Sequence, residues 1–250
     1  MSNITSTILT NTVYQNNKTI KTVNLDYVTW KNNSMSEAFN NCDNITDVTN
    51  INENVTSMYN TFYYCSKLVN APIIPNSVTN MSGTFSGCIN LVNAPIIPNS
   101  VTDMTQTFLS CSKLVNAPII PNSVDSMSGT FGSCRNLVNA PVICNSVTDM
   151  FSAFIYCYNL VNAPVIPNSV TRMGGTFGSC YNLTGDIYIH SAKIITATYC
   201  FANTTLTKNV YIPFTYENGV NTATYNSFIR EGYNENGTLC GVYLKDINTL

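Results

Sequence analysis

The feature that most constrains the fold of this chain is an internal repeat with a period of 23 residues. Methionine, phenylalanine and cysteine each return at this interval in a fixed order. The repeated methionines are Met35, Met58, Met81, Met104, Met127, Met150 and Met173. One unit of this size cannot bury its own apolar residues, so successive units must stack and share a continuous core. The sequence therefore predicts a solenoid in which each repeated residue forms a column.

Each unit divides into two segments that predict different local structures. A nearly fixed segment, Leu-Val-Asn-Ala-Pro-Ile-Ile, begins at Leu68 in the second unit and predicts a short parallel β-strand. Its prolines should limit the strand to about three or four paired residues, closed by Pro-Asn-Ser as a turn. The other segment, Met-x-x-Thr-Phe-x-x-Cys-x-x-Leu, spaces its apolar residues as in a helix, and its glycines favour short helical or 3₁₀ turns.

The combination of Ile-Pro-Asn-Ser-Val-Thr with Phe-x-x-Cys-x-x-Leu resembles the BspA-type (treponemal-type) leucine-rich repeat, and the resemblance covers residues 35–183. The step from Met81 to Phe85 is shorter than is usual in that family and is more similar to repeats of mycoplasma-type surface proteins. The resemblance implies a leucine-rich-repeat-like solenoid with binding roles, commonly adhesion at a cell or virion surface. It implies no catalytic residue.

The extent of the repeat divides the chain into three parts. Residues 1–34 lack the repeat and predict one or two strands that form an N-terminal cap or, alternatively, a segment that attaches the chain to a larger assembly. Residues 35–183 form the regular solenoid. Residues 184–250 predict degenerate units and a C-terminal cap, with strands at Asp186-Ile-Tyr-Ile, Val210-Tyr-Ile-Pro and Val242-Tyr-Leu-Lys.

The composition excludes several classes of partner. Charged residues make up only 10 % of the chain and the net charge is −2, so the basic stripe of a nucleic-acid-binding protein is missing. The sequence contains no run of about 18 apolar residues, and we expect no membrane insertion.

The start, Met-Ser-Asn-Ile-Thr, does not resemble a secretory signal peptide. We expect an extracellular or virion-surface location, with no leader visible in this chain.

The residues that could carry chemistry do not form a catalytic or metal-binding pattern. Most of the 10 cysteines fall at one position of the repeat and none forms a Cys-x-x-Cys pair, so buried thiols are favoured over a metal site. Parallel Cβ directions disfavour disulfides between neighbouring units. Cys144 and Cys240 are the thiols expected at the surface. His190 lacks a partner pattern, and we expect no enzyme activity, no cofactor and no metal.

The units differ from one another mainly between Met and Leu, and the difference alternates along the chain. Units that begin at Met58, Met104 and Met150 carry large side chains there, whereas the intervening units carry serine and glycine. Two interpretations remain open: a ridged surface that binds a partner, or relief of crowding between neighbouring units. The candidate binding face comprises Tyr59, Tyr63, Tyr64, Gln106, Leu109, Phe151, Ile155, Tyr156 and Tyr158.

The nearly fixed strand segment predicts a second surface. Apolar side chains on its outer side would form stripes, and exposed apolar area of that extent usually marks an interface. We therefore expect a self-association face that packs against another subunit. Its candidate residues are Val69, Pro72, Ile74, Ile97 and Ile120.

The sequence favours a non-enzymatic recognition or adhesion module that binds a protein or glycan on a cell surface. A phage or virus tail or fibre protein is one form of this hypothesis. The alternative is a structural scaffold whose solenoid mediates oligomer or virion assembly. A glycan-cleaving β-solenoid comes third, because it would need carboxylates clustered on one face and the repeats supply none.

Overall fold

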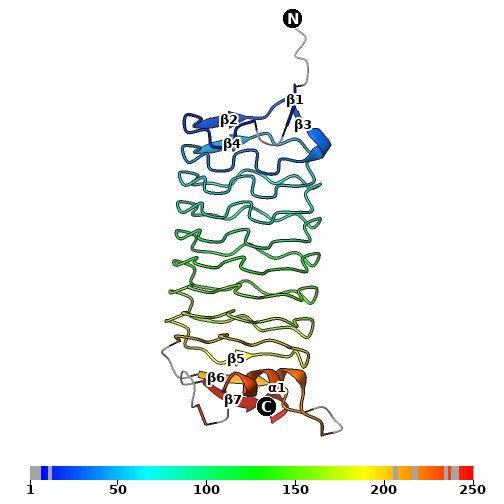
Figure 1. Ribbon diagram of the computed structural model, residues 1–250, viewed down its shortest axis with the longest axis vertical. Coiled ribbons are helices and arrows are strands. Elements are labelled where there is room, and N and C mark those ends of the chain that lie inside the picture. The colour runs from blue at the N-terminus through cyan, green and yellow to red at the C-terminus, as the bar shows by residue number, and fades with distance from the viewer. Residues whose placement is uncertain are drawn as a thin grey trace, which may run out of the picture.

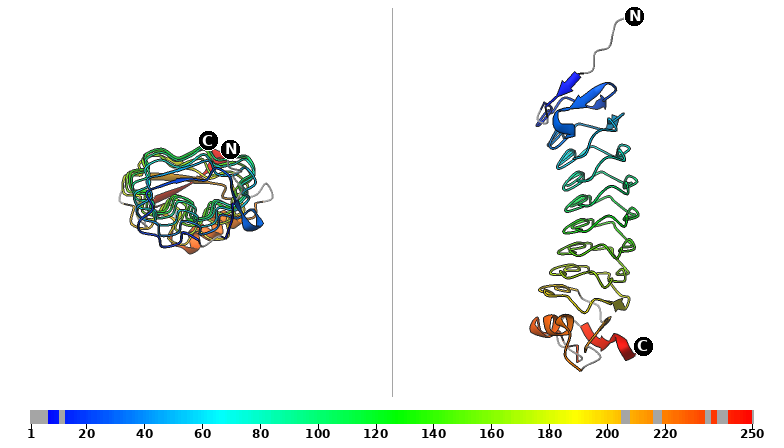
Figure 2. Two further views of the ribbon diagram at one scale, coloured as in Figure 1. Left: turned by 90° about the horizontal axis from the view of Figure 1, so that it is seen from above. Right: turned by 90° about the vertical axis from the view of Figure 1, so that its right-hand side faces the viewer.

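The structure, a computed structural model, describes residues 7–10, 13–204, 208–215, 219–233, 236–237 and 242–249. The chain winds into a stack of coils, one for each 23-residue unit (Figure 1). Viewed along the axis, the coils superimpose as flattened rings (Figure 2). The predicted solenoid is confirmed.

Regular secondary structure is confined to the two ends of the stack. Near the N-terminus two parallel strand pairs form, β1 (Thr7–Leu9) with β3 (Val28–Trp30) and β2 (Thr22–Asn24) with β4 (Asp47–Thr49), and η1 (Lys31–Asn33) follows β3. At the other end, β5 (Ile187–Tyr188), β6 (Lys208–Ile212) and β7 (Val242–Asp246) form a parallel sheet with β6 in the centre. The helices there are α1 (Ala223–Arg230) and η2 (Ile247–Thr249).

In the regular coils the predicted strand is reduced to isolated pairs. One column of parallel bridges joins the asparagines Asn70, Asn93, Asn116, Asn139 and Asn162, and a second joins residues just before the repeated methionines. Proline explains the reduction. Pro72 and Pro75 follow the bridge residue Asn70 and have no N–H group with which to extend the ladder.

The Met-to-Leu side forms a succession of turns rather than a short helix. The N–H of Thr84 donates to the carbonyl of Met81 in the same coil (3.0 Å), whereas the N–H of Phe85 donates to Thr107 of the next coil (2.9 Å). The second and sixth residues after Met adopt left-handed backbone angles, as at Gly83 (φ 63°) and Gly87 (φ 76°). A left-handed residue in the third position of a turn prevents helical continuation, so the helix-like spacing of apolar residues arises from consecutive turns.

Stacked side chains fill the interior. The phenylalanine column runs from Phe39 to Phe201, with ring centroids 5.6 Å apart at Phe39–Phe62 and 5.7 Å apart at Phe177–Phe201. Tyr14 continues the column into the N-terminal segment and Phe228 of α1 continues it at the other end. The phenylalanines of this column are fully buried in the regular coils, as are the columns of Met, Cys and Leu. This burial is the main force that holds the coils together.

Two interior columns are polar. The Thr84 hydroxyl donates to the carbonyl of Met58 in the preceding coil (2.8 Å), and the Cys88 thiol donates to the carbonyl of Phe62 (3.1 Å). The same contacts recur at Thr107 and Cys111. These side chains satisfy buried backbone carbonyls, which explains why small polar residues stand in the core at these positions.

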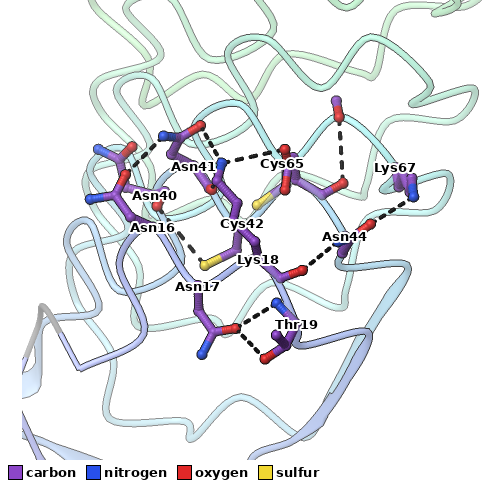
Figure 3. A network of polar contacts seen from close by, with 12 residues as sticks. Asn16, Asn17, Lys18, Thr19, Asn40, Asn41, Cys42, Asn44, Cys65 and Lys67 are labelled. Atoms are coloured by element: carbon purple, nitrogen blue, oxygen red, sulfur yellow. Dashed lines mark hydrogen bonds and ion pairs between the residues drawn. The ribbon is translucent and has the colours of Figure 1, made fainter.

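The N-terminal segment covers the first coil through polar contacts (Figure 3). The N–H of Asn16 donates to the carbonyl of Asn40 (2.8 Å), and the Asn41 amide donates to the Asn16 side chain (2.8 Å). The Lys18 ammonium donates to the carbonyl of Asn41 (2.8 Å) and pairs with Asp43 (3.3 Å). Carbonyls that have no preceding coil to bond to are thereby satisfied.

The C-terminal segment supplies acceptors to the last coil. The N–H of Phe201 has no further regular coil to bond to and donates instead to the Tyr233 hydroxyl (3.0 Å). The N–H of Ile194 donates to the hydroxyl of Thr224 in α1 (3.0 Å). The Thr222 hydroxyl caps α1 by accepting from the N–H of Tyr225 (3.0 Å). Within residues 184–250, where the sequence predicts degenerate units and a cap, Ala223–Arg230 thus form a helix that closes the core.

The Tyr233 contact leads to a stability prediction. Tyr233→Phe should lower the free energy of unfolding by about 1–3 kcal/mol, because the buried N–H of Phe201 loses its acceptor. Tyr225→Phe, in the same cap, is the matched control and should change stability by less than about 0.5 kcal/mol. Urea denaturation of both variants measures the difference. Equal effects would show that the hydroxyl of Tyr233 does not support the last coil.

Candidate binding surfaces

Two sides of the coil stack carry the sequence-predicted residues. We call the Met-to-Leu side the turn face; it comprises residues 58–68, 81–91, 104–114, 127–137, 150–160 and 173–183. The proline face comprises the Val-Asn-Ala-Pro-Ile-Ile-Pro segments, residues 69–75, 92–98, 115–121, 138–144 and 161–167.

The predicted binding residues all lie on the turn face, where the structure places their rings in two groups. Tyr63 and Tyr64 meet edge to face with centroids 4.5 Å apart, and Tyr156 meets Tyr158 at 6.4 Å. The groups are four coils apart, which is about 19 Å at ~4.8 Å per coil. Tyr59, Tyr64, Gln106, Phe151 and Tyr156 are exposed, whereas Tyr63, Leu109, Ile155 and Tyr158 are partly buried. Burial, together with the neighbouring Tyr64, raises the pKa of the Tyr63 phenol.

Contacts between coils account for much of the large-and-small alternation. A Cβ atom added at Gly87 would lie 2.8 Å from the ring of Tyr64, and one at Gly132 would lie 2.9 Å from Leu109. Phe151 lies in the same way over Gly174, at 3.0 Å. Large side chains therefore cover the small residues of the adjacent coil, as the crowding interpretation requires. Their outer surfaces remain open, so the same side chains still form ridges.

A stacked group on the turn face was not predicted from the sequence. The Arg135 guanidinium lies 5.4 Å from the centroid of the Tyr158 ring, and Tyr181 stacks on Tyr158 at 5.1 Å. The repeat itself contained the signal. All three residues follow a repeated methionine by eight positions, so stacking of the coils must align them.

The predicted self-association face needs a correction. Val69 is exposed as expected, but Pro72, Ile74, Ile97 and Ile120 are buried, so the prediction that they form an outer stripe is wrong. Strict strand alternation fails because the prolines confine pairing to the asparagine column. Val69 and Asn70, although consecutive, are both exposed.

A different aliphatic row occupies the surface of the proline face. The first residue of each Ile-Ile or Val-Ile pair points outward: Ile73 is 88 % exposed, and Ile96 and Ile119 are each 90 % exposed. Val142 and Val165 continue this aliphatic stripe. Hollows separate its members, for example one of about 360 Å³ beside Ile96 and Ile119 and one of about 410 Å³ beside Val142 and Val165.

Comparison with known families confirms the resemblance seen in the sequence. A family model described as the BspA type leucine-rich repeat region matches in six copies, over residues 2–114, 32–161 and 105–231. The chain belongs to the BspA-type leucine-rich repeat family. A search of curated protein sequences found no match.

Solved structures similar to this BspA-type chain are themselves leucine-rich repeat proteins. A leucine-rich repeat protein from Bacteroides ovatus is 23 % identical over 64 % of this chain, with a TM-score of 0.49. The chain spans 44 % of that protein's length. The T. pallidum leucine-rich repeat protein is 24 % identical, with a TM-score of 0.45, and the alignment covers 59 % of this chain and 72 % of that one.

The thiols and the histidine of this BspA-type solenoid occupy separate environments. Burial raises the pKa of the Cys65, Cys88 and Cys134 thiols far above their usual range.

Within the described ranges, no group of three His, Cys, Asp or Glu side chains is placed to hold a metal ion. None of the helices in the same ranges is long and apolar enough to cross a bilayer. His190 is exposed beside the hollow at Val165.

Cys144 and Cys240 are the two thiols expected at the surface. Cys144 is partly buried and its thiol donates to the carbonyl of Ile120 (2.9 Å). Cys240 lies outside the described residues.

The crowding contacts predict a cost for an added methyl group. Gly87→Ala should destabilise the protein by about 2–4 kcal/mol, because it combines a left-handed backbone with a clash against the Tyr64 ring. Gly219 has a similar φ (78°) but open space around its Cβ position, so Gly219→Ala is the control and should cost about 1 kcal/mol. Thermal unfolding of both variants measures the difference. A Gly87 effect no larger than the control would rule out crowding as the cause of the alternation.

The thiol environments predict selective labelling. Iodoacetamide at pH 9 should leave Cys65, Cys88 and the other buried cysteines unmodified in the native protein, because burial both excludes the reagent and disfavours the thiolate. Peptide mass spectrometry after labelling, with a urea-unfolded sample as the positive control, identifies the modified residues. Rapid native labelling of Cys88 would contradict the buried column.

Proposed function

We propose that this protein is a non-enzymatic recognition module that binds a surface protein or glycan through the turn face. One observation carries the proposal. Two groups of partly exposed aromatic rings, around Tyr63 and around Tyr156, stand on one side of a stacked scaffold. Large aromatic side chains with little rotamer freedom are the residues that most often anchor binding partners.

The division between core and surface supports this proposal. The buried columns are occupied by the same residues in nearly every coil, whereas the exposed positions of the turn face vary. A surface that varies on a constant scaffold suits recognition, since its changes leave the packing intact. The proposal covers display on a cell surface and on a virion tail or fibre, because a solenoid presents the turn face identically in both settings.

A scaffold that self-assembles is the second candidate, and the aliphatic stripe favours it. Ile96 and Ile119 are almost fully exposed, and exposed apolar rows are typical of interfaces. The hollows between stripe residues recur with the same period as the residues themselves. A second copy turned end for end would match that period, with its side chains in the hollows.

Alanine substitution of the aromatic anchors tests the recognition proposal. Tyr63→Ala and Tyr156→Ala should each weaken binding to a glycan array or to host cells by about tenfold or more, which corresponds to ~1.4 kcal/mol for an anchor residue. Tyr27→Ala removes an exposed tyrosine away from the turn face and should leave binding unchanged. Melting temperatures within a few degrees of wild type would show that the variants are folded.

The opposite results favour the scaffold. If the wild-type protein binds nothing in either screen, sediments as a dimer, and becomes monomeric on Ile119→Asp, self-assembly through the aliphatic stripe replaces recognition. Unchanged binding by both alanine variants would remove the turn face from the proposal.

A further inference from the structure

Cations gather along one edge of the turn face. In the coils from Met58 onward, the eighth and ninth residues after each methionine form one edge, and its ionisable cations are Lys67, Lys113 and Arg135. No acidic residue occurs at these positions between residues 58 and 183. The acidic residues between residues 58 and 183 are Asp103, Asp125 and Asp149, which stand just before the methionines and outside the turn face. Arg172 also lies there and pairs with Asp149. We call the edge formed by the eighth and ninth residues the basic edge.

Arg135 is the last cation along the basic edge and has no counter-charge among the described residues. Its side chain is exposed, with the guanidinium carbon 5.4 Å from the centroid of the Tyr158 ring, and it forms no ion pair with any other described residue. Arg172 provides the contrast, because its guanidinium pairs with Asp149 at 2.9 Å. A stacked guanidinium keeps its N–H groups free at the edge of its plane, in the geometry that a carboxylate accepts bidentately.

The stack cannot be explained by the alternation of large and small residues. Crowding relief places large side chains in every second coil, but Arg135, Tyr158 and Tyr181 occupy three consecutive coils. The large-and-small alternation therefore does not account for this column. Asparagines stand at the next position of the same three coils, Asn136, Asn159 and Asn182, and all are exposed.

We propose that the basic edge between Arg135 and Tyr181 binds a carboxylated sugar of an acidic glycan. The guanidinium of Arg135 receives the carboxylate, and the exposed surfaces of Tyr156 and Tyr181 contact the C–H faces of the sugar rings. The asparagine amides bind hydroxyl groups through the donors and acceptors that remain after the Asn182 amide donates to Asn159 (3.3 Å). This inference rests on the proposed recognition function and specifies the ligand class.

The surface chemistry favours a sugar over an acidic peptide. Peptide recognition relies on pockets for side chains, but the hollows beside Ile96, Ile119 and Val142 lie on the proline face. The basic edge instead combines a cation, flat rings and a row of amides. Lys113 and Lys67 extend the same edge, two coils or about 10 Å apart, so a linear glycan with repeated carboxylates could run along it.

Titration calorimetry with defined saccharides tests the inference. The probes are 3′-sialyllactose and hexagalacturonate as carboxylated sugars, lactose as the neutral sugar, and poly-glutamate as the acidic peptide. Wild-type protein should bind at least one carboxylated sugar, which identifies the source, and should bind lactose at least tenfold more weakly. The affinity should fall as the salt concentration is raised from 50 to 500 mM, because screening weakens the charge contact.

Two charge-matched variants localise the site. Arg135→Gln should weaken sugar binding by about tenfold or more, the effect of losing a charged hydrogen-bond pair. Arg230→Gln removes the same charge from the exposed end of α1, far along the chain from the stack, and should leave binding unchanged. Tyr181→Ala should also weaken binding, with unfolding temperatures confirming that all three variants are folded.

Other outcomes overturn the inference in distinguishable ways. Equal losses for both arginine variants, or tighter binding of poly-glutamate than of any sugar, would reject a carboxylated-sugar site at Arg135. Absence of sugar binding up to millimolar concentrations would do the same. If the protein then binds a neutral glycan or a cell-surface protein through Tyr63, the recognition function stands alone; if no screen gives binding, both proposals fail.

Discussion

The backbone hydrogen bonds between coils are the interaction on which the rest of this structure depends. On the turn face, alternate N–H groups bond within the coil and to the next coil, as at Thr84 and Phe85. This pattern requires a left-handed residue at two fixed positions of every unit, which breaks the segment into turns. It also favours a constant unit length, since the same positions must face one another in successive coils. The 23-residue period is therefore a consequence of hydrogen bonding as well as of core packing. The step from Phe177 to Phe201 is one residue longer, and the extra residue is accommodated with the two rings still stacked at 5.7 Å.

The solenoid and its core columns could be predicted from the sequence because both depend on the same residue types returning at a fixed interval. It could not predict the left-handed positions, since Gly87, Tyr64 and Ser133 occupy equivalent places and no single residue type marks them. The outward-facing aliphatic residue was also assigned wrongly. Ile73 and Ile74 are chemically alike, and only the way in which the prolines interrupt the strand determines which of them is buried.

In the candidate site, too, some features follow from the sequence and others only from the way the coils stack. The aromatic positions Tyr63 and Tyr156 were found from the variation among units. The contact of Arg135 with Tyr158 does not show in the sequence of any single coil, because it joins residues of neighbouring coils. In a solenoid, residues that share a position in consecutive units are spatial neighbours, so columns are the appropriate units for locating a site.

Rigidity gives this arrangement its value for binding. A long side chain such as arginine ordinarily loses rotamer entropy when it contacts a ligand, and that loss reduces affinity. Arg135 already lies against Tyr158, which is itself held between the guanidinium and Tyr181. The coils beneath are fixed by fully buried phenylalanines and by hydrogen-bonded thiols such as Cys134 (3.1 Å to the carbonyl of Phe108). Much of the ordering cost is therefore met on folding, so a few exposed groups on a nearly uncharged surface can suffice for recognition.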